Sequence, residues 1–292
     1  MKVSLAVLAL VAAAMGLTAA WADDTATQPP PDKSQFSVLN PTPEADLRTL
    51  CADRPTKSNG PCTVDAGHWQ LESDVYNVTL QTLDGVTTRT ELFTNPTLKL
   101  GLTNTVDFEV NVAPYEQVST HDSIAGVSSR VGGVGDVFLR AKWNLRGDDG
   151  GTTSLALFPF VKIPTARLGV GNGAVEGGLI VPIAFNLPGN WQLTIDPEAD
   201  ALANSVGSGH HLNITSPLSL SYPVTKTITL FGELWGDVNF DPIGTVSQAS
   251  FDLAIAWIPA KAPNLQLDGG ANLGLNRATP GAQLYVGVTR RF

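Results

Sequence analysis

Apolar and polar residues alternate along residues 282–292, the last eleven of the chain. Read with a period of two, the apolar residues fall on one face and the polar residues on the other, which predicts an amphipathic strand ending on Phe292. Such a strand needs a partner for its edge and an apolar medium for one face. A barrel closed in a lipid bilayer supplies both, because its last strand pairs with its first and leaves no edge.

The same alternation recurs in eleven further segments of about ten residues, the length that a tilted membrane strand requires. These are residues 67–75, 91–100, 106–112, 136–145, 155–163, 179–187, 191–198, 211–222, 227–237, 248–257 and 264–273. Short connections such as 101–105 alternate with longer ones such as 117–135 and 165–174, as in barrels with both chain ends in the periplasm. Five aromatic residues near strand ends fit an interface girdle: Trp69, Trp143, Trp191, Tyr222 and Trp257. The pattern predicts an all-β fold, a single antiparallel transmembrane β-barrel of about 12 strands formed by residues 63–292.

Composition removes several other classes of protein. The chain is 43% hydrophobic but only 15% charged, and it has 28 glycines without a second apolar run long enough for a membrane helix. These values exclude a disordered chain and a helical membrane protein. The formal net charge is −9, and loss of Lys2 with a leader gives −10, so nucleic acid is not expected as a partner.

The N-terminal 62 residues divide into two parts. Residues 1–22 contain a basic start, an apolar run and the sequence Ala20-Trp21-Ala22, which together predict a cleaved signal peptide. A membrane anchor would need a longer apolar span. Residues 23–62 are rich in Pro, Thr, Ser and Asp and predict a flexible periplasmic arm whose last part docks against the end of the barrel.

Cys51 and Cys62 are the two cysteines of the chain, and both lie in this arm. In an exported protein they are expected to form a disulfide that contributes roughly 3 kcal/mol by the chain-entropy estimate. A metal site built from two thiols without a neighbouring histidine is the weaker alternative. Neither a metal nor a cofactor is predicted.

Five short stretches carry a resemblance that spans nearly the whole mature chain. They are residues 53–58 (DRPTKS), 63–72 (TVDAGHWQLE), 133–136 (GVGD), 157–164 (LFPFVKIP) and 176–180 (EGGLI). They resemble the putative meta-pathway-of-phenol-degradation outer-membrane family. The resemblance implies an outer-membrane barrel and, more loosely, a transporter of aromatic or other small compounds. The C-terminal strand also resembles the closing strand of such barrels, in which the terminal aromatic, here Phe292, is part of the signal for the barrel-assembly machinery; Arg290 departs from that pattern.

The four histidines, His68, His121, His210 and His211, are the candidate bases of a barrel hydrolase. His68 and His211 are predicted to point into the lumen, His121 to lie in a loop, and His210 at the end of a loop. None is predicted to face outward beside a serine, so a lipid-facing catalytic pair is not expected. A metal site at His210 and His211 is weak, because adjacent side chains of a strand diverge.

The inward face of the predicted barrel is rich in charge. Arg140, Lys142 and Lys162 come from neighbouring strands and are predicted to form one cationic patch. Carboxylates gather elsewhere, at Glu72, Asp74, Asp107 and Glu109, and also at Asp196, Glu198 and Asp200. Two interpretations remain open: a structural network of ion pairs that fills a narrow barrel, or a charged pore lining that selects solutes. Phe138, Phe158 and Phe160 also point inward and either fill space or form a shelf for an apolar ring.

The sequence favours an outer-membrane channel or transporter for passive uptake of small molecules, aromatic compounds among them, without enzyme activity. The alternatives are a structural or surface barrel with a plugged lumen and, less favoured, a barrel hydrolase. The expected partners are outer-membrane lipid, the barrel-assembly machinery and a small-molecule solute, and no oligomeric state is predicted.

Overall fold

The computed structural model describes residues 32–292. The predicted signal peptide and residues 23–31 of the predicted arm therefore lie outside the described residues. Within residues 32–292, no helix is long and apolar enough to cross a membrane.

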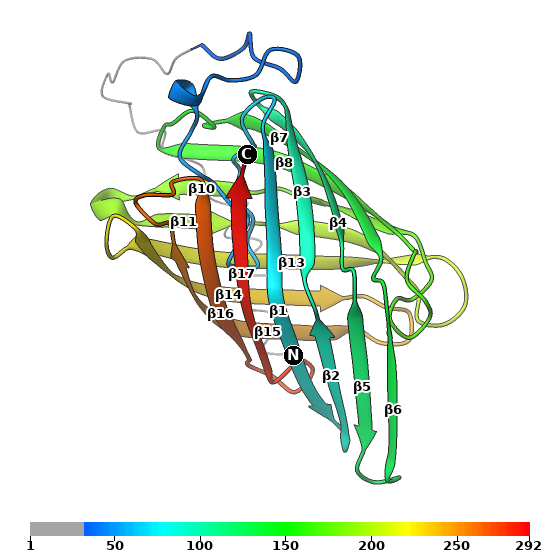
Figure 1. Ribbon diagram of the computed structural model, residues 1–292. Coiled ribbons are helices and arrows are strands. Elements are labelled where there is room, and N and C mark those ends of the chain that lie inside the picture. Colours follow the sequence, from blue (N-terminus) through cyan, green and yellow to red (C-terminus); the bar gives the residue numbers. More distant parts are fainter. Residues whose placement is uncertain (1–31) are drawn as a thin grey trace.

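Seventeen strand segments form one antiparallel sheet that closes on itself, because β1 pairs with β17 from Gln70–Arg291 to Leu80–Ala282 (Figure 1). The segments are β1 (Trp69–Leu83), β2 (Val86–Leu92), β3 (Asn95–Thr103), β4 (Val106–Val112), β5 (Glu116–Asp122), β6 (Val127–Gly133), β7 (Val137–Arg146), β8 (Thr153–Ile163), β9 (Glu176–Ile180), β10 (Ile183–Asn186), β11 (Gln192–Ile195), β12 (Glu198–Ala203), β13 (His210–Pro223), β14 (Ile228–Asn239), β15 (Val246–Trp257), β16 (Leu265–Gly274) and β17 (Ala282–Arg291). Two 3-10 helices, η1 (Glu44–Asp46) and η2 (Pro188–Asn190), complete the elements.

Five passages of the barrel wall consist of two segments each, so the seventeen segments make twelve strands, and the predicted barrel is confirmed. The two-part passages are β2–β3, β4–β5, β6–β7, β9–β10 and β11–β12. Pro114, Pro182 and Pro197 lie at three of the interruptions. Proline has no N–H to donate to a ladder, so it breaks the segment where it occurs.

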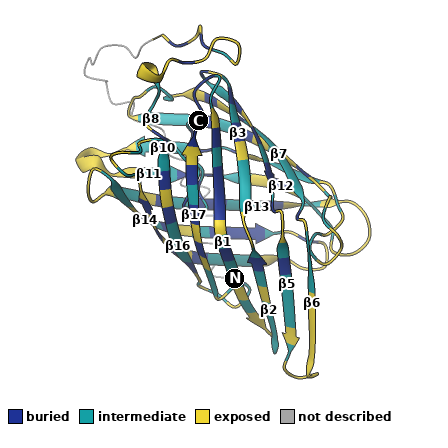
Figure 2. Ribbon diagram, viewed as in Figure 1, coloured by how far each residue is buried: buried dark blue, intermediate teal, exposed yellow. Residues whose placement is uncertain are grey.

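The barrel is apolar outside and polar inside. Gln70, Glu72 and Lys99 are among many buried polar side chains of the wall, whereas Leu98 and Leu284 on the outer face are 43% and 50% exposed (Figure 2). A soluble barrel would have the opposite arrangement, so the outer face is suited to lipid. Trp69, Trp143, Trp191 and Trp257 are all more than two-fifths exposed on this face, as predicted for a girdle, and Trp191 stacks against Tyr222 with ring centroids 4.6 Å apart.

The prediction that residues 117–135 form a loop is wrong for most of this range. β5 and β6 pair along their length and form a hairpin around residues 123–126. β2 pairs with both β1 and β5, so the sheet continues beyond the barrel body, and Figure 1 shows this extension at the end opposite the C-terminus. The segment contains Ser119, His121, Ser128 and Arg130 but few apolar residues, which made its alternation hard to recognise.

The described part of the arm lies at the same end of the barrel as the C-terminus and then enters the barrel (Figure 1). Val38 donates to the carbonyl of Leu102 at 3.0 Å and Thr42 to that of Ala66 at 2.9 Å, which fixes the arm to the rim. The sequence indicated docking against the barrel end. The side-chain contacts below place residues 53–59 inside the lumen instead.

Candidate functional site

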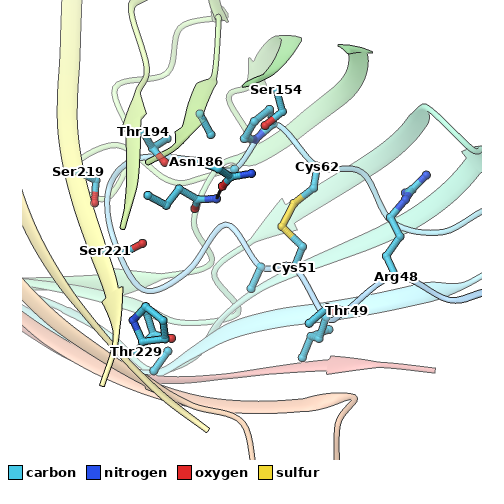
Figure 3. Close-up of a pocket in the computed structure, with 18 of the residues that line it drawn as sticks. Arg48, Thr49, Cys51, Cys62, Ser154, Asn186, Thr194, Ser219, Ser221 and Thr229 are labelled. Carbon is cyan, nitrogen blue, oxygen red and sulfur yellow. Dashed lines mark hydrogen bonds between the residues drawn. A yellow bond between two sulfur atoms is a disulfide. The ribbon is translucent and has the colours of Figure 1, made fainter. Parts of the chain in front are cut away.

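Cys51 and Cys62 form a disulfide, as predicted, and close a loop of the arm that projects into the lumen (Figure 3). Residues 51–62 are called the lumen loop below. A Cβ atom on Gly60 would lie 3.2 Å and 3.4 Å from the two sulfur atoms, so glycine allows the chain to pass close to the bridge. The disulfide therefore shapes a compact element that can fit between the walls of a narrow barrel.

Arg54 fixes one side of the lumen loop to the wall. Its guanidinium donates to Asp74 of β1 at 2.6 Å and to Asp268 of β16 at 2.7 Å. The guanidinium occupies the space that a side chain at Gly287 of β17 would need. The absence of a Cβ at this position in the closing strand thus lets Arg54 lie against the wall between two carboxylates.

Lys57 fixes the opposite side of the loop. Its ammonium lies 2.9 Å from Asp252 and 4.4 Å from the ring centroid of Trp235. The backbone N–H groups of Lys57 and Ser58 each donate to the carboxylate of Glu233 at 3.0 Å. Because Glu233 and Asp252 are each 1% exposed, these contacts supply partners for carboxylates that would otherwise be buried alone.

Asp53 connects the loop to further charged residues of the barrel wall. The part of the wall with buried charged side chains that face the loop is called the charged wall below: Glu72, Asp74, Lys99, Asp107, Glu109, Lys142, Glu233, Asp252 and Asp268. Its carboxylate accepts from Lys142 at 2.5 Å and from Lys99, and Lys99 also lies 2.7 Å from Glu72 and 3.3 Å from Glu109. Burial alone would raise the pKa of Asp53, but the two lysines hold that pKa well below its usual range. Asp53 is therefore ionised in the folded protein, and its negative charge compensates the buried ammonium groups of Lys99 and Lys142.

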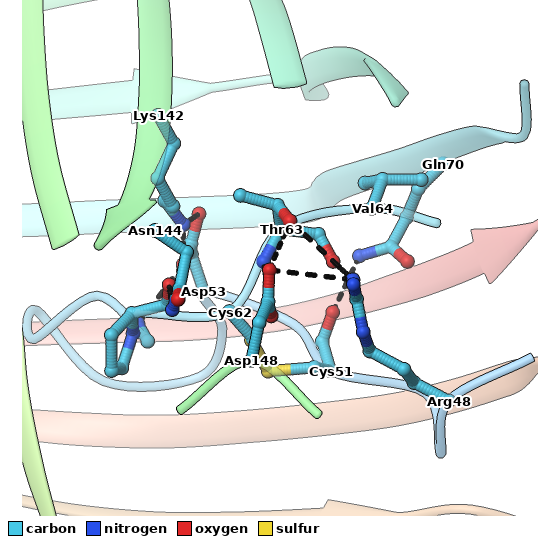
Figure 4. Close-up of a disulfide and its surroundings, with 12 residues drawn as sticks. Arg48, Cys51, Asp53, Cys62, Thr63, Val64, Gln70, Lys142, Asn144 and Asp148 are labelled. Atoms are coloured by element: carbon cyan, nitrogen blue, oxygen red, sulfur yellow. Dashed lines mark hydrogen bonds and ion pairs between the residues drawn. A yellow bond between two sulfur atoms is a disulfide. The ribbon is translucent and has the colours of Figure 1, made fainter. Parts of the chain in front are cut away.

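The base of the loop is held by a second charge network at the rim (Figure 4). Arg48 pairs with Asp149 at 2.9 Å and with Asp148 at 3.4 Å, and both carboxylates belong to the turn between β7 and β8. Arg291 at the end of β17 pairs with Asp65 at 2.9 Å. The segments before and after the disulfide are thus fixed to the barrel independently of the loop tip.

One part of the lumen wall carries no charge. The inward residues of β10, β11 and the end of β13 are small or neutral polar ones and are called the neutral wall: Ala184, Asn186, Gln192, Thr194, Ser219 and Ser221. Between this wall and the lumen loop lies a cavity of about 980 Å³, and Figure 3 shows Thr194, Ser219 and Ser221 among the residues that line it. The lumen loop also reaches the end of β11, where the Asn59 side-chain amide donates to Asp196 at 3.1 Å, so the cavity lies beside the seated loop.

The predicted patch of Arg140, Lys142 and Lys162 does not form. Lys142 binds the lumen loop, whereas Lys162 lies 2.7 Å from Glu176 and 3.3 Å from Asp136. The register pairs Phe138 with Lys162 and Arg140 with Phe160, which places Lys142 about four residues from Lys162 along the strands, or roughly 13 Å. The shared inward face was correct, but the strand stagger was not accessible from the sequence.

The other predicted lumen residues are placed as follows. Glu72, Asp74, Asp107 and Glu109 are all at least nine-tenths buried on the charged wall. Phe158 is 1% exposed and lies under the Lys142 ammonium at 4.6 Å from its ring centroid. Phe138 and Phe160 contact each other with centroids 6.3 Å apart, and Arg140 lies over Phe138 at 5.2 Å. Phe292 is 63% exposed and its N–H donates to the carbonyl of Trp69 at 2.8 Å.

The histidines differ in part from expectation. His121 lies in β5, not in a loop, and its Nδ1 is 2.9 Å from the Ser128 hydroxyl across the hairpin. Both residues are exposed, and among the described residues no carboxylate is hydrogen-bonded to the other ring nitrogen of His121 to orient it. The geometry is a cross-strand pair on a solvated extension, which lacks the third member of a catalytic triad. His68 bonds Thr42 and Phe292 carbonyls at the rim, and His211 lies 3.6 Å from Asp241.

No group of three or more His, Cys, Asp or Glu side chains within residues 32–292 is arranged to hold a metal ion. The residues that seat the lumen loop were not predicted from the sequence; they are chiefly Arg54, Lys57, Lys99, Asp252 and Asp268. A signal was present, because residues 53–58 place two basic side chains and an aspartate in a barrel whose predicted interior is acidic. This charge complementarity was not recognised, because residues 23–62 were predicted to form a flexible arm.

Comparison with known proteins identifies the family. A family model described as "Putative MetA-pathway of phenol degradation" matches residues 52–292. The chain belongs to this family. The match begins inside the lumen loop and continues to the C-terminus, so family membership covers the whole barrel.

A search of curated protein sequences found no match. Among solved structures, the chain is similar to the COG4313 outer membrane channel from Pseudomonas putida F1, with a TM-score of 0.60, 15% identity, and coverage of 77% of this chain and 95% of that one. It also matches the NanC porin (TM-score 0.48, 8% identity, 76% and 98% covered) and the β domain of the Bordetella autotransporter BrkA (TM-score 0.46, 12% identity, 77% and 98% covered). The closed barrel, its apolar outer belt and the first of these matches together identify a β-barrel of the bacterial outer membrane.

Proposed function

We propose that the protein is a passive outer-membrane channel for small molecules, with a path between the lumen loop and the neutral wall. The observation that carries this proposal is the cavity of about 980 Å³ beside the loop, which has the uncharged polar groups of the neutral wall on one side and charged residues of the arm and rim elsewhere. Solutes that move along such a surface exchange water for hydroxyl and amide contacts. The similar structure from Pseudomonas putida is itself described as a channel, which agrees with this proposal.

Aromatic compounds are the proposed solute class, with two supports. The family description refers to phenol degradation. Phe138 and Phe160 place two half-buried rings on the inner wall beyond the cavity, where they offer apolar contact to a ring that passes, whereas Phe158 is covered by Lys142. A small phenol would combine such contacts with hydrogen bonds to the neutral wall.

Conductance of purified protein in planar bilayers tests the route. Ser219 is 3% exposed on the neutral wall, and Leu220, the next residue, is 39% exposed on the lipid face. We expect Ser219→Trp to lower single-channel conductance severalfold, because the indole would enter the cavity. Leu220→Trp adds the same side chain to the outside and serves as the matched control. Equal conductance of the two variants would contradict the proposed path.

A plugged structural barrel is the second candidate, and one observation favours it. The lumen loop makes ion pairs with wall residues on several strands, as a permanent plug would. A wild-type barrel that is folded, as judged by heat-modifiable migration on a gel, but that conducts no ions and takes up no phenol would establish this alternative.

Phe292 is proposed to act in assembly, not in passage. It is 63% exposed at the end of the closing strand, and Arg290 of the same strand lies over its ring. Deletion of Phe292 should lower the amount of heat-modifiable barrel in outer membranes and leave the conductance of each assembled channel unchanged. A normal amount of folded barrel would contradict a role in recognition by the assembly machinery.

A further inference from the structure

Beyond the lumen loop, aromatic rings and carboxylates lie together on the inner wall. The antiparallel register aligns inward residues of five neighbouring segments, β8, β9, β12, β13 and β14, in two adjacent rows. One row contains Phe160, Gly178, Asp200 and Asn213, and the next contains Phe158, Ile180, Glu198, Thr215 and Asp237. Glu198, Asp200 and Asp237 are called the acidic patch below.

The acidic patch has more acceptors than donors. The Asn213 amide donates to Asp200 at 3.3 Å and to Asp237 at 2.8 Å, and the Thr215 hydroxyl donates to Asp237 at 2.8 Å. Oδ1 of Asp200 and Oδ1 of Asn213 remain without a partner, although the two side chains are only 7% and 5% exposed. A buried acceptor that lacks a donor costs about 1–3 kcal/mol, so a bound group that donates hydrogen bonds would stabilise these oxygens.

The acidic patch also lacks a counter-charge. No ion pair within residues 32–292 involves Glu198, Asp200 or Asp237, and the Arg140 guanidinium on β7 lies over the Phe138 ring, 5.2 Å from its centroid. Glu198 and Asp200 are two residues apart on β12, so their carboxyl groups are neighbours on the same inward face. Two carboxylates this close repel each other unless a proton or a cation lies between them.

Gly178 makes room for a second feature of the site. A Cβ atom there would collide with the Asp200 carboxylate and would lie 2.8 Å from the ring of Phe160. The glycine thus lets a carboxylate and an aromatic ring face the same space. A carboxylate beside a ring recognises an organic ammonium, because the ring adds both apolar contact and a cation–π interaction.

We infer that the acidic patch binds the protonated amino group of a small organic amine whose apolar skeleton contacts Phe160. An ammonium provides up to three N–H donors, which matches the unpartnered oxygens of Asp200 and Asn213. A metal ion fits less well, since the described residues contain no group arranged to hold one. This inference rests on the proposed channel, within which the site would select cationic solutes.

Phenethylammonium chloride and the neutral phenethyl alcohol provide a matched pair of probes. In planar bilayers, we expect the ammonium to reduce the current through the wild-type channel at concentrations where the alcohol has no effect. In the variant Asp200→Asn with Asp237→Asn, we expect the half-blocking concentration to rise roughly 10- to 100-fold, the range that one or two lost charge-assisted hydrogen bonds give. Asp84→Asn removes a charge at the exposed turn between β1 and β2 and serves as the control.

A second variant separates shape from charge. Gly178→Ala fills the space between Asp200 and Phe160 without changing charge, so it should weaken block by phenethylammonium and leave the reversal potential in a salt gradient unchanged. Heat-modifiable migration on a gel verifies that each variant is folded.

Titration calorimetry of phenethylammonium with detergent-solubilised protein measures the same site without flux. Calorimetric binding that the Asp200→Asn, Asp237→Asn variant loses supports the inference even if no current is seen, and that absence of current counts against the channel alone. Equal binding of amine and alcohol, or binding that both variants retain, would overturn the inference while a conducting channel stands.

Discussion

The charged wall and the neutral wall of the lumen differ in what they contact. On the charged wall, Asp74, Asp252 and Asp268 bind Arg54 and Lys57 of the lumen loop at 2.6–2.9 Å. On the neutral wall, Thr194, Ser219 and Ser221 face a cavity. Buried charges need partners, and the arm supplies them, whereas hydroxyl groups can be left to water. On these two parts of the wall, carboxylates hold the arm, whereas uncharged side chains border a cavity.

Among substitutions at the contacts of the charged wall, we expect the largest effect at Arg54, whose guanidinium binds two carboxylates. Arg54→Met leaves Asp74 and Asp268 buried without a partner, which commonly costs about 3–5 kcal/mol. We expect the lumen loop to leave its seat, with faster hydrogen exchange in residues 51–62 and a higher single-channel conductance.

A compensated variant separates charge from packing. Arg54→Met combined with Asp74→Asn and Asp268→Asn removes the unpaired charges, and it should recover much of the barrel's lost stability toward urea without restoring the loop contacts. If the triple variant is as unstable as Arg54→Met, the packing of Arg54 against Gly287 matters more than its ion pairs.

Removal of the disulfide is the next largest change. Cys51→Ser with Cys62→Ser should cost the seated arm roughly 3 kcal/mol, because the open loop gains chain entropy when it is displaced. The rim contacts of Arg48 and Arg291 lie outside the loop, so the barrel itself should unfold at the same urea concentration. Hydrogen exchange of residues 51–62 measures the first effect and urea titration the second. A parallel loss of barrel stability would mean that the loop supports the whole wall.

Features of this arrangement that depend on neighbouring residues could be predicted from the sequence, whereas features that depend on residues far apart in the chain could not. The strands and the inward faces follow from a period of two, which is local, and Glu72, Asp107 and Lys142 were therefore assigned correctly to the lumen. The separation of Lys142 from Lys162 depends on strand stagger, and the seating of Arg54 depends on residues more than 200 positions away in the chain. Neither is encoded in a local pattern. The β5–β6 hairpin was missed because its polar residues resemble a loop.

Acidification offers a milder way to weaken the charged wall. Lys142 and Lys99 hold the pKa of Asp53 well below its usual range despite burial, so the folded carboxyl group gives up its charge at lower pH than the unfolded one. A carboxyl group whose pKa is lower in the folded than in the unfolded protein stabilises the fold. This stabilisation is fully present above the unfolded-state pKa of about 3.9 and is lost as the pH falls through the folded-state pKa. Protection from hydrogen exchange of the Gly60 amide, which donates to Asp53 at 3.0 Å, should therefore persist at pH 5 and decrease below about pH 4. Asp53→Asn should show weaker protection at both pH values, and loss of wild-type protection already near pH 6 would contradict this assignment.

The smallest effect is expected on the neutral wall, where one hydroxyl can be removed without changing shape. Thr194→Val replaces a hydroxyl with a methyl group beside the cavity and touches no contact of the lumen loop. Stability toward urea should change by less than about 1.5 kcal/mol, and loop exchange should stay at the wild-type rate. Passage of a phenol should slow relative to that of benzene, because only the phenol loses a hydrogen bond to the wall. Uptake of the two solutes into liposomes measures the ratio, with Leu193→Ala on the adjacent outward position as the control. If the ratio is unchanged, the hydroxyl groups of the neutral wall line the cavity without contacting what passes, and the path lies closer to the loop. The contrast between the two walls would then concern only how the arm is held.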